Sequence, residues 1–411
     1  MSARVAGLVA TLAVALACQP AAAKENSFAQ VERGRYLAMV GDCASCHTAP
    51  GGKPFAGGRA LNTPFGAIYS SNITPDLQTG IGAWSDDDFY RAMHSGIDAE
   101  GDHLYPAFPY PYYTHVTRDD ALAIRAYLQT LEPVRSRRPA NDLFFPLNQR
   151  FLLFGWNMLN FDKGEFKPDP GKSAAWNRGA YLVEGLGHCG ACHTPKDFTG
   201  ADIKGRELTG GLLDNWLAPA LTGLKRGGLA GWSEDDIADF LQNGRNRHGA
   251  AYGPMAEVVE LSTSKMTRDD LLAMATYLKS LKPDSEDDTR HTPDPAAMKR
   301  GGALYTDNCS TCHGGNGEGT PLFFAALKGS GVVQSTDPTT VIHAILKGVR
   351  AAPTDRYPTA LSMPTFEWKL SDREIADLAT FIRNNWGNSA PAVSAGEVHS
   401  LRKALHARAG D

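Results

Sequence analysis

Six of the seven cysteines in this 411-residue chain belong to three copies of one five-residue pattern. Each copy is Cys-x-x-Cys-His, and the two intervening residues let the chain turn so that both thiols face the same way. Two such thiols can add across the two vinyl groups of one haem, and the following histidine then lies under the iron as its proximal ligand. The sequence predicts covalently bound haem c at three places: Cys43, Cys46 and His47; Cys189, Cys192 and His193; Cys309, Cys312 and His313.

A Cys-x-x-Cys pair also occurs in zinc sites and in redox-active dithiols. Zinc needs four ligands close together, whereas long stretches of chain separate these pairs. A thioredoxin-type dithiol needs no adjacent histidine and stands near a βαβ pattern, which this sequence lacks. Because a histidine follows all three pairs, both alternatives are disfavoured.

A second iron ligand is expected on the opposite face of each haem, and methionine is the usual one in electron-transfer cytochromes. Met255 and Met363 follow the second and third motifs, each beside a proline and ahead of an amphipathic helix. We predict that these two methionines bind iron. Met266 and Met274 lie at or inside the helix of the second repeat, where methionine more often fills a core.

The first motif has no methionine at the matching position, because Phe108 stands there and phenylalanine cannot bind iron. Met93, His94 and His103 are the candidate substitutes. Met93 aligns with Leu241 on a core-facing helix, which favours a packing role, so His103 is the leading candidate. Without a substitute, the first haem is five-coordinate or carries water.

The sequence around the motifs also repeats, which indicates three similar units. An Arg-Gly pair precedes each motif, beginning at Arg33, Arg178 and Arg300. Ser85 and Ser233 stand before acidic residues and predict helix N-termini. A helix that leads into the motif and a last helix that crosses it make a haem-sized helical domain. The predicted last helices are 117–131, 267–281 and 371–385.

We therefore predict an all-α protein with three tandem cytochrome c-type domains. In the tail, Ser394 and Glu397 form a capping-box pattern, and Val398, Leu401 and Leu405 lie on one stripe of a short helix. The predicted segments are a signal peptide (1–23), domain 1 (28–133), an aromatic-rich connector (134–174), domain 2 (175–283), an acidic linker (284–295), domain 3 (296–388) and a C-terminal tail (389–411).

The first residues have the three parts of a secretory signal: a basic start, a run of small apolar residues from Val5 to Ala17, and Ala21-Ala22-Ala23 as a cleavage site. The run is too short for a good membrane span, so we expect cleavage and export. Cys18 offers a lipoprotein signal as the competing interpretation, which Ala15 makes less favourable. No later segment is apolar enough to span a membrane.

The predicted connector contains two apolar runs, 144–147 and 151–159, both rich in phenylalanine. Packing between domains is the simpler interpretation of these runs. The alternative is a docking patch for a partner subunit or for the membrane surface, because aromatic patches mark interfaces.

The composition is that of a folded chain, with 42% hydrophobic and 21% charged residues. The formal net charge of −4 lacks the basic excess of a nucleic-acid binder. No glycine-rich dinucleotide fingerprint and no Ser/His/Asp arrangement stands out. The expected chemistry is therefore single-electron transfer by haem iron, with any organic oxidation on a partner.

Three Cys-x-x-Cys-His units, the Arg-Gly-x-Tyr-Leu sequences, the stretch from Leu104 to Ala107 and the Met363-Pro364-x-Phe366-x-Trp368 ending resemble the triheme cytochrome c subunits of bacterial membrane-bound dehydrogenases. Those subunits serve alcohol, gluconate, sorbitol or aldehyde oxidation. The resemblance implies a periplasmic protein, peripheral on the outer face of the cytoplasmic membrane. It implies a catalytic partner with a quinone, flavin or molybdenum cofactor, and ubiquinone or a terminal oxidase as acceptor.

A rival interpretation makes the chain itself a haem enzyme. An open first haem could reduce peroxide or nitrogen oxides, and Glu100 with His103 would then act as a distal acid–base pair. The simpler interpretation of these two residues is a polar loop. A redox-inert zinc or scaffold protein is the third alternative, and it would be colourless.

Overall fold

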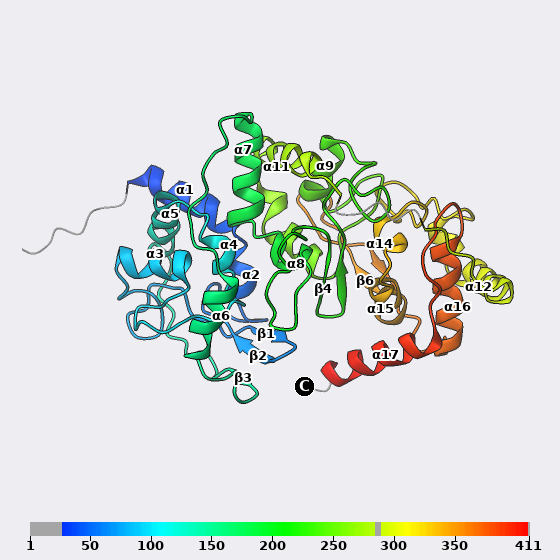
Figure 1. Cartoon of the computed structure of the whole chain (residues 1–411), viewed down its shortest axis with the longest axis horizontal. Helices are drawn as coiled ribbons and strands as arrows, with labels where there is room; N and C mark the ends of the chain where they lie inside the picture. The colour runs from blue at the N-terminus through cyan, green and yellow to red at the C-terminus, as the bar shows by residue number, and fades with distance from the viewer. Residues whose placement is uncertain (1–26, 284–288, 410–411) are drawn as a thin grey trace, which may run out of the picture.

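The computed structural model describes residues 27–283 and 289–409. The predicted signal peptide with Cys18 lies outside the described residues, as does the first part of the predicted acidic linker. Among the residues that the structure describes, no helix has the length and apolar character needed to cross a bilayer. Figure 1 shows the chain running from the helices of the first repeat on one side to those of the third on the other.

Three pairs of packed helices organise the fold. In each pair a leading helix enters a Cys-x-x-Cys-His motif and a closing helix crosses it, as predicted. The leading helices are α1 (Phe28–Val40), α7 (Ala174–Ala180), which the π-helical turn η1 (Tyr181–Leu186) continues, and α12 (Pro295–Asn308). The closing helices are α5 (Arg118–Leu128), α11 (Arg268–Ser280) and α16 (Asp372–Asn384), which contact α1, α7 and α12 respectively.

The Arg-Gly pair of each leading helix explains why these crossings are tight. A Cβ atom on Gly34, Gly179 or Gly301 would lie 1.7, 1.9 or 2.1 Å from a backbone oxygen of the closing helix, so only glycine permits this approach. The preceding arginine in each case binds an aspartate of the same closing helix. These pairs are Arg33–Asp120, Arg178–Asp270 and Arg300–Asp377.

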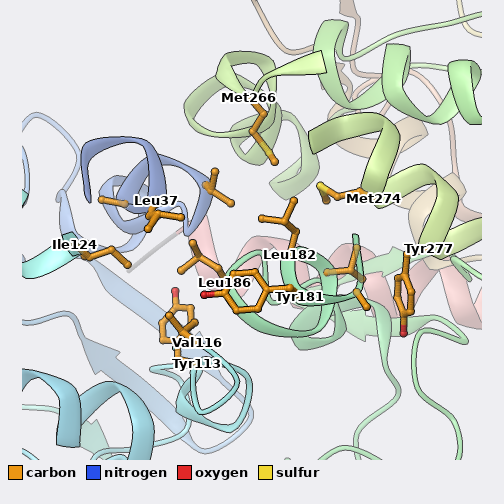
Figure 2. Close-up of a cluster of buried hydrophobic side chains, with 14 of the residues drawn as sticks. Leu37, Tyr113, Val116, Ile124, Tyr181, Leu182, Leu186, Met266, Met274 and Tyr277 are labelled. Carbon is orange, nitrogen blue, oxygen red and sulfur yellow. The ribbon is translucent and has the colours of Figure 1, made fainter. Parts of the chain in front are cut away.

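The first and second repeats share one hydrophobic core, whereas the third has its own. Figure 2 shows Leu37 and Ile124 from the first repeat beside Leu182 and Leu186 from the second. Burying large aliphatic side chains of both repeats in one cluster stabilises their association as well as each repeat. The two repeats therefore form one packed body.

Each repeat adds shorter helices around the haem-attachment motif. The predicted starts at Ser85 and Ser233 are confirmed, because both serines close capping boxes with the aspartate three residues on. The motif helices are α2 (Cys43–His47), α8 (Gly190–His193) and α13 (Ser310–His313). The others are α3 (Asp86–Ser95), α4 (Tyr110–Tyr113), α9 (Glu234–Asn243), α10 (Pro254–Leu261), the 3₁₀ turn η2 (Thr263–Lys265), α14 (Gly331–Gln334) and α15 (Thr339–Lys347).

The chain is mostly helical, but it is not entirely so, and the prediction of an all-α protein needs correction there. Short antiparallel hairpins follow the first two motifs: Gly66, at positive φ, adjoins the turn between β1 and β2, and Asp214 and Asn215, both at positive φ, make the turn between β4 and β5. The strands are β1 (Ala60–Thr63), β2 (Gly66–Tyr69) and β3 (Asp142–Leu143) in one sheet, β4 (Gly211–Leu213) with β5 (Trp216–Ala218), and β6 (Val349–Arg350) with β7 (Ser362–Met363).

The connector packs on the first repeat and also leaves apolar side chains exposed. Its strand β3 joins the sheet of β1 and β2, and its helix α6 (Leu152–Asn160) buries Leu153. We call the outward-facing side chains the connector patch, and each of them is more than half exposed. They are Phe144, Phe145, Phe151, Phe154, Met158 and Leu159. The connector thus combines packing against the first repeat with an exposed apolar patch.

The tail folds back on the third repeat as helix α17 (Ala395–Ala409). The predicted capping box is confirmed, with Ser394 and Glu397 bonding each other's backbone N–H groups. Val398, Leu401 and Leu405 pack on the core of the third repeat, against the surface formed by α15 and α16. The predicted stripe is therefore the buried face of α17.

Candidate haem sites

The three motif histidines share one hydrogen-bonding arrangement. The Nδ1 atoms of His47, His193 and His313 lie 2.7, 2.7 and 2.8 Å from the backbone oxygens of Ser71, Pro219 and Ala325. A backbone carbonyl can only accept, so Nδ1 carries the proton and Nε2 keeps its lone pair. Burial lowers the pKa of all three imidazoles, which favours this neutral form. Each ring is thereby set to bind iron through Nε2.

The motif cysteines are also arranged for attachment rather than for disulfide bonding. All six described cysteines are free. Burial raises the pKa of Cys43 and Cys189 to about 12 and that of Cys309 to about 11. A buried site disfavours thiolate, whereas a thioether carries no charge and suits it. These donors fit covalently bound haem at each motif.

Met255 lies in the first turn of α10 and packs beside Phe240 and Val259. The backbone fixes its place, because the N–H of Ala251 bonds the oxygen of Gly244, which ends α9 in the left-handed region. Met255 lies four residues after Ala251, the donor of this bond. Met255 therefore lies at the start of a helix, directly after Pro254.

The first repeat has the same backbone bond, from the N–H of Leu104 to the oxygen of Gly96, and Gly96 likewise ends its helix at positive φ. Four residues further on stands Phe108. Counted from this bond, Phe108 therefore matches Met255, although it lies in a bend before α4 rather than within a helix. Its ring packs edge-on against Tyr113, with centroids 5.4 Å apart.

The three candidate substitutes in the first repeat lie in different environments. Met93 is buried in the shared core, as its alignment indicated. His94 stacks on Tyr90, and its Nδ1 atom lies 2.9 Å from the oxygen of Thr114. His103 turns toward α6, where its Nδ1 atom lies 3.3 Å from the amide nitrogen of Asn157. Glu100, the other member of the hypothetical acid–base pair, is exposed.

Met363 occupies β7, whose partner β6 places Val349 directly opposite it. A cavity of about 470 Å³ lies between this hairpin and α10, and Val349 and Gly253 are among its lining residues. Beside it, Trp216 of β5 stacks on His343 of α15 with ring centroids 3.8 Å apart. The stretches that carry Met255 and Met363 thus face each other where the second and third repeats meet.

An ion pair joins the surroundings of the first motif to helix α10 of the second repeat. Arg59 bonds the backbone oxygen of Ser45 inside the first motif, and its guanidinium also binds the carboxylate of Glu257 on α10. Asp42 lies nearby and is almost fully buried, and one of its carboxylate oxygens has no hydrogen-bond partner within the described chain. Burial raises the pKa of Asp42 to about 7. The surroundings of the first motif and helix α10 are therefore electrostatically coupled.

Comparison with known proteins identifies the family. The cytochrome c family profile matches residues 31–132 and 298–386. The gluconate 2-dehydrogenase cytochrome c subunit of Pantoea cypripedii is 43% identical over 396 residues, which cover 91% of this chain and 90% of that protein. This chain belongs to the cytochrome c subunits of dehydrogenases. The predicted resemblance is confirmed, and haem c binding and electron transfer follow for this cytochrome c subunit.

Two further relatives belong to other dehydrogenases. The cytochrome c subunit of the quinone alcohol dehydrogenase of Gluconacetobacter polyoxogenes is 41% identical over 394 residues, covering 91% of this chain and 84% of that protein. The fructose dehydrogenase cytochrome subunit of Gluconobacter japonicus is 34% identical over 414 residues, covering 93% of this chain and 84% of that protein. Similar cytochromes thus serve dehydrogenases with different substrates.

Sequence reasoning missed the residues that hold the cytochrome c subunit's helix pairs together. It used the Arg-Gly pairs only as a sign of repetition, although each arginine has a defined aspartate partner. The signal was present, because Asp120 and Asp270 occupy the same position in the first turn of their helices. Arg59 and Glu257 carried no such signal, since the two residues are far apart and in different repeats.

Proposed function

We propose that this cytochrome c subunit carries three haems c and relays single electrons from a catalytic dehydrogenase subunit to ubiquinone or a terminal oxidase. The shared arrangement of the three motif histidines carries this proposal, because every motif offers an imidazole with its Nε2 lone pair free. Each haem supplies an iron that alternates between ferric and ferrous states. The protein's part is to bind the haems, exclude water and set their potentials.

The proposed attachment residues are the six motif cysteines, and the proposed proximal ligands are His47, His193 and His313. We propose Met255 and Met363 as the opposite ligands of the second and third haems, where a thioether favours the ferrous state and raises the potential. The first haem lacks this ligand because of Phe108, so its potential is expected to be the lowest of the three. The proposed domains are 28–133, 175–283 and 296–388.

The donor is proposed to be a dehydrogenase subunit with a quinone, flavin or molybdenum cofactor. The test is to mix the purified holoprotein anaerobically with a co-purifying catalytic subunit and its substrate, and to follow haem reduction by absorbance. Reduction of the haems only when both are present supports the relay. Haems that stay oxidised while the partner turns over with an artificial dye would exclude it.

We propose export to the periplasm and peripheral attachment to the outer face of the cytoplasmic membrane. The connector patch supports attachment, because exposed phenylalanine, leucine and methionine side chains on one helix lower their free energy at a lipid interface. Replacing Met158 and Leu159 by serine is expected to release the protein from vesicles of anionic phospholipid, measured by flotation. Leu77, 72% exposed on the first repeat, gives the matched control Leu77→Ser.

The second candidate function is peroxide reduction at the first haem, and the place of Phe108 favours it because it leaves one iron face without methionine. Steady-state turnover of hydrogen peroxide by the purified chain distinguishes the two functions. A rate no faster than that of free haem supports the relay alone. Turnover that His103→Ala abolishes would support a catalytic first haem.

A further inference from the structure

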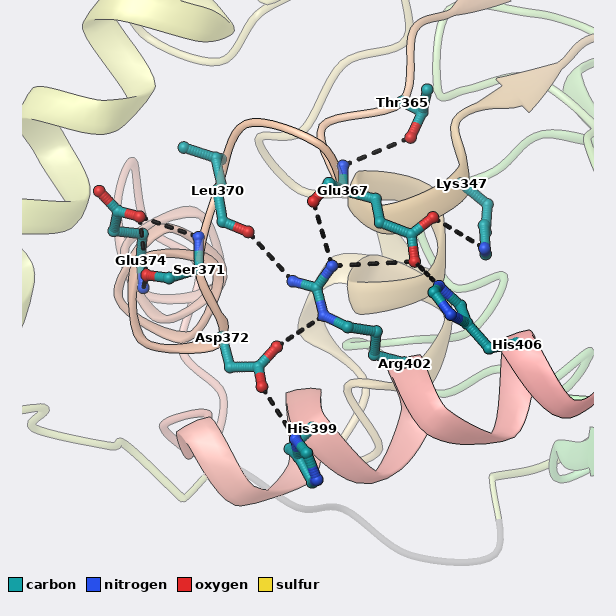
Figure 3. Close-up of polar contacts among 10 residues, drawn as sticks. All are labelled: Lys347, Thr365, Glu367, Leu370, Ser371, Asp372, Glu374, His399, Arg402 and His406. Atoms are coloured by element: carbon teal, nitrogen blue, oxygen red, sulfur yellow. Dashed lines mark hydrogen bonds and ion pairs between the residues drawn. The ribbon is translucent and has the colours of Figure 1, made fainter.

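Helix α17 fastens the stretch of chain that follows Met363. Figure 3 shows this contact, in which Arg402 lies at the centre of a group of polar side chains. Its Nη1 atom donates to the backbone oxygen of Glu367 over 3.2 Å, and its Nη2 atom donates to that of Leu370 over 3.0 Å. Its Nε atom donates to the carboxylate of Asp372 over 2.7 Å. One guanidinium thus bonds three points of the chain that leads from Met363 into α16.

The carboxylate of Glu367 adds two further contacts to this stretch of chain. Lys347 of α15 donates to it over 2.7 Å, and His406 of α17 contacts its other oxygen. His399 adds a contact to Asp372, 3.1 Å from the carboxylate. Helix α17 therefore contacts the segment 363–372 through His399, Arg402 and His406. Lys347 of α15 adds a contact to the same segment.

The backbone of this segment is bonded at its other end as well. Met363 pairs with Val349 between β7 and β6, and the N–H of Phe366 bonds the oxygen of Ile345 over 2.9 Å. The segment thus has one anchor at Met363 and Phe366 and a second anchor at residues 367–372. Arg402 belongs to the second anchor, and its side chain is only 20% exposed.

We infer that Arg402 is a positioning residue for the sixth ligand of the third haem, and that α17 keeps the sulfur of Met363 on the iron. The inference rests on the proposed function, because it requires Met363 to be that ligand. A thioether is a weak ligand. When the segment that carries Met363 opens locally, a stronger base from solution therefore replaces the sulfur as the ligand. Removing the guanidinium takes the donor from the backbone oxygens of Glu367 and Leu370 and leaves Asp372 with His399 alone among the described residues, which makes such opening more frequent.

The test uses the ferric holoprotein with its three haems, and imidazole as the added base. The absorption band that arises from methionine sulfur bound to ferric iron reports only methionine-ligated haems. The share of the band lost in Met363→Ala defines the contribution of the third haem. In Arg402→Gln, we expect that share to disappear at an imidazole concentration about tenfold lower than in the wild type, since losing charged hydrogen bonds favours opening by that order.

Arg373→Gln is the matched control, because Arg373 is an exposed arginine of the same repeat that pairs over 3.5 Å with Asp377, which keeps Arg300 as its closer partner. It should leave the imidazole titration unchanged. Arg402→Lys keeps the charge but cannot reach all the acceptors, so it should fall between the wild type and Arg402→Gln. If Arg402→Gln incorporates fewer than three haems, Arg402→Lys takes its place in the titration.

The outcomes separate the inference from the ligand assignment. If Met363→Ala removes part of the band and both Arg402 variants titrate like the wild type, the positioning role is wrong and the ligand assignment stands. If Met363→Ala leaves the band intact, the ligand assignment is wrong and the inference fails with it. A circular dichroism spectrum unchanged among the variants excludes general unfolding as the cause of any difference.

Discussion

Tyr36 of the first repeat donates a hydrogen bond of 2.7 Å to Asp270 of the second. The reverse bond is also present, since Tyr181 of the second repeat donates to Asp120 of the first over 2.6 Å. Each aspartate is the one that the Arg-Gly pair of its own repeat binds. The first two repeats are therefore related by an approximate two-fold arrangement, and the same two carboxylates hold the helix pairs together and join the repeats.

We expect Tyr36→Phe and Tyr181→Phe each to destabilise the holoprotein by about 1 kcal/mol, because each removes one hydrogen bond and leaves the aspartate with its arginine. The measurement is the guanidinium midpoint of the first unfolding transition, followed by circular dichroism. Tyr305→Phe is the control, since its hydroxyl bonds Gly314 within the third repeat. An equal effect of Tyr305→Phe on that first transition would contradict the cross-repeat role.

Changing both Cys189 and Cys192 to alanine should lower the covalently bound haem from three to two per chain. The reason is that the second motif lies in its own site, with its own proximal histidine and carbonyl partner. Denaturation in alkaline pyridine and the absorbance of the ferrous complex count the haems. Three haems per chain in this variant would mean that the second motif binds none. The single change Cys18→Ala should leave the count at three.

The helices of this fold could be predicted from the sequence because their signals are local. A serine before acidic residues marks the start of α3 and α9, and the spacing of apolar residues marks the closing helices. The haem-attachment motifs are local as well, since each histidine directly follows its second cysteine. The Tyr36–Asp270 bond and the Arg402 contacts were not predicted, because each depends on residues that only the tertiary fold brings together. The hairpins were missed although the turns of β1–β2 and β4–β5 are local, because their strands are only three or four residues long.

The capping carboxylate of α9 should make the second repeat sensitive to acid. Burial works against the charge on Asp236, but the N–H and hydroxyl of Ser233 together with Arg247 and His248 outweigh it and lower the pKa to about 2. A carboxyl whose pKa is lowered in the folded state stabilises the protein above its unfolded pKa of 3.8. That stability is lost as the pH falls from about 4 toward 2.

Asp236→Asn should therefore reduce the free energy of unfolding by roughly 1–2 kcal/mol at neutral pH, and the difference from wild type should shrink below about pH 4. Guanidinium midpoints measured between neutral pH and about pH 3 test this. Glu234→Gln, at an exposed position in the same helical turn, is the control and should show no such trend. A difference that stays constant with pH would assign the effect of Asp236→Asn to packing.

The equivalence of Phe108 and Met255 predicts that one substitution can give the first haem a methionine ligand. Both residues stand four positions after the donor of a backbone bond to the glycine that ends the preceding helix, Met255 in the first turn of α10 and Phe108 two residues before α4. In Phe108→Met, the ferric holoprotein should gain about half again as much of the methionine–iron band as the wild type shows, because two ligated haems become three. The potential of the lowest-potential haem should rise with it. Ala107→Met, one position earlier, points its side chain elsewhere and should gain no band. If Phe108→Met leaves both band and potential unchanged, another residue already occupies that face of the first iron, and His103→Ala then shows whether it is His103.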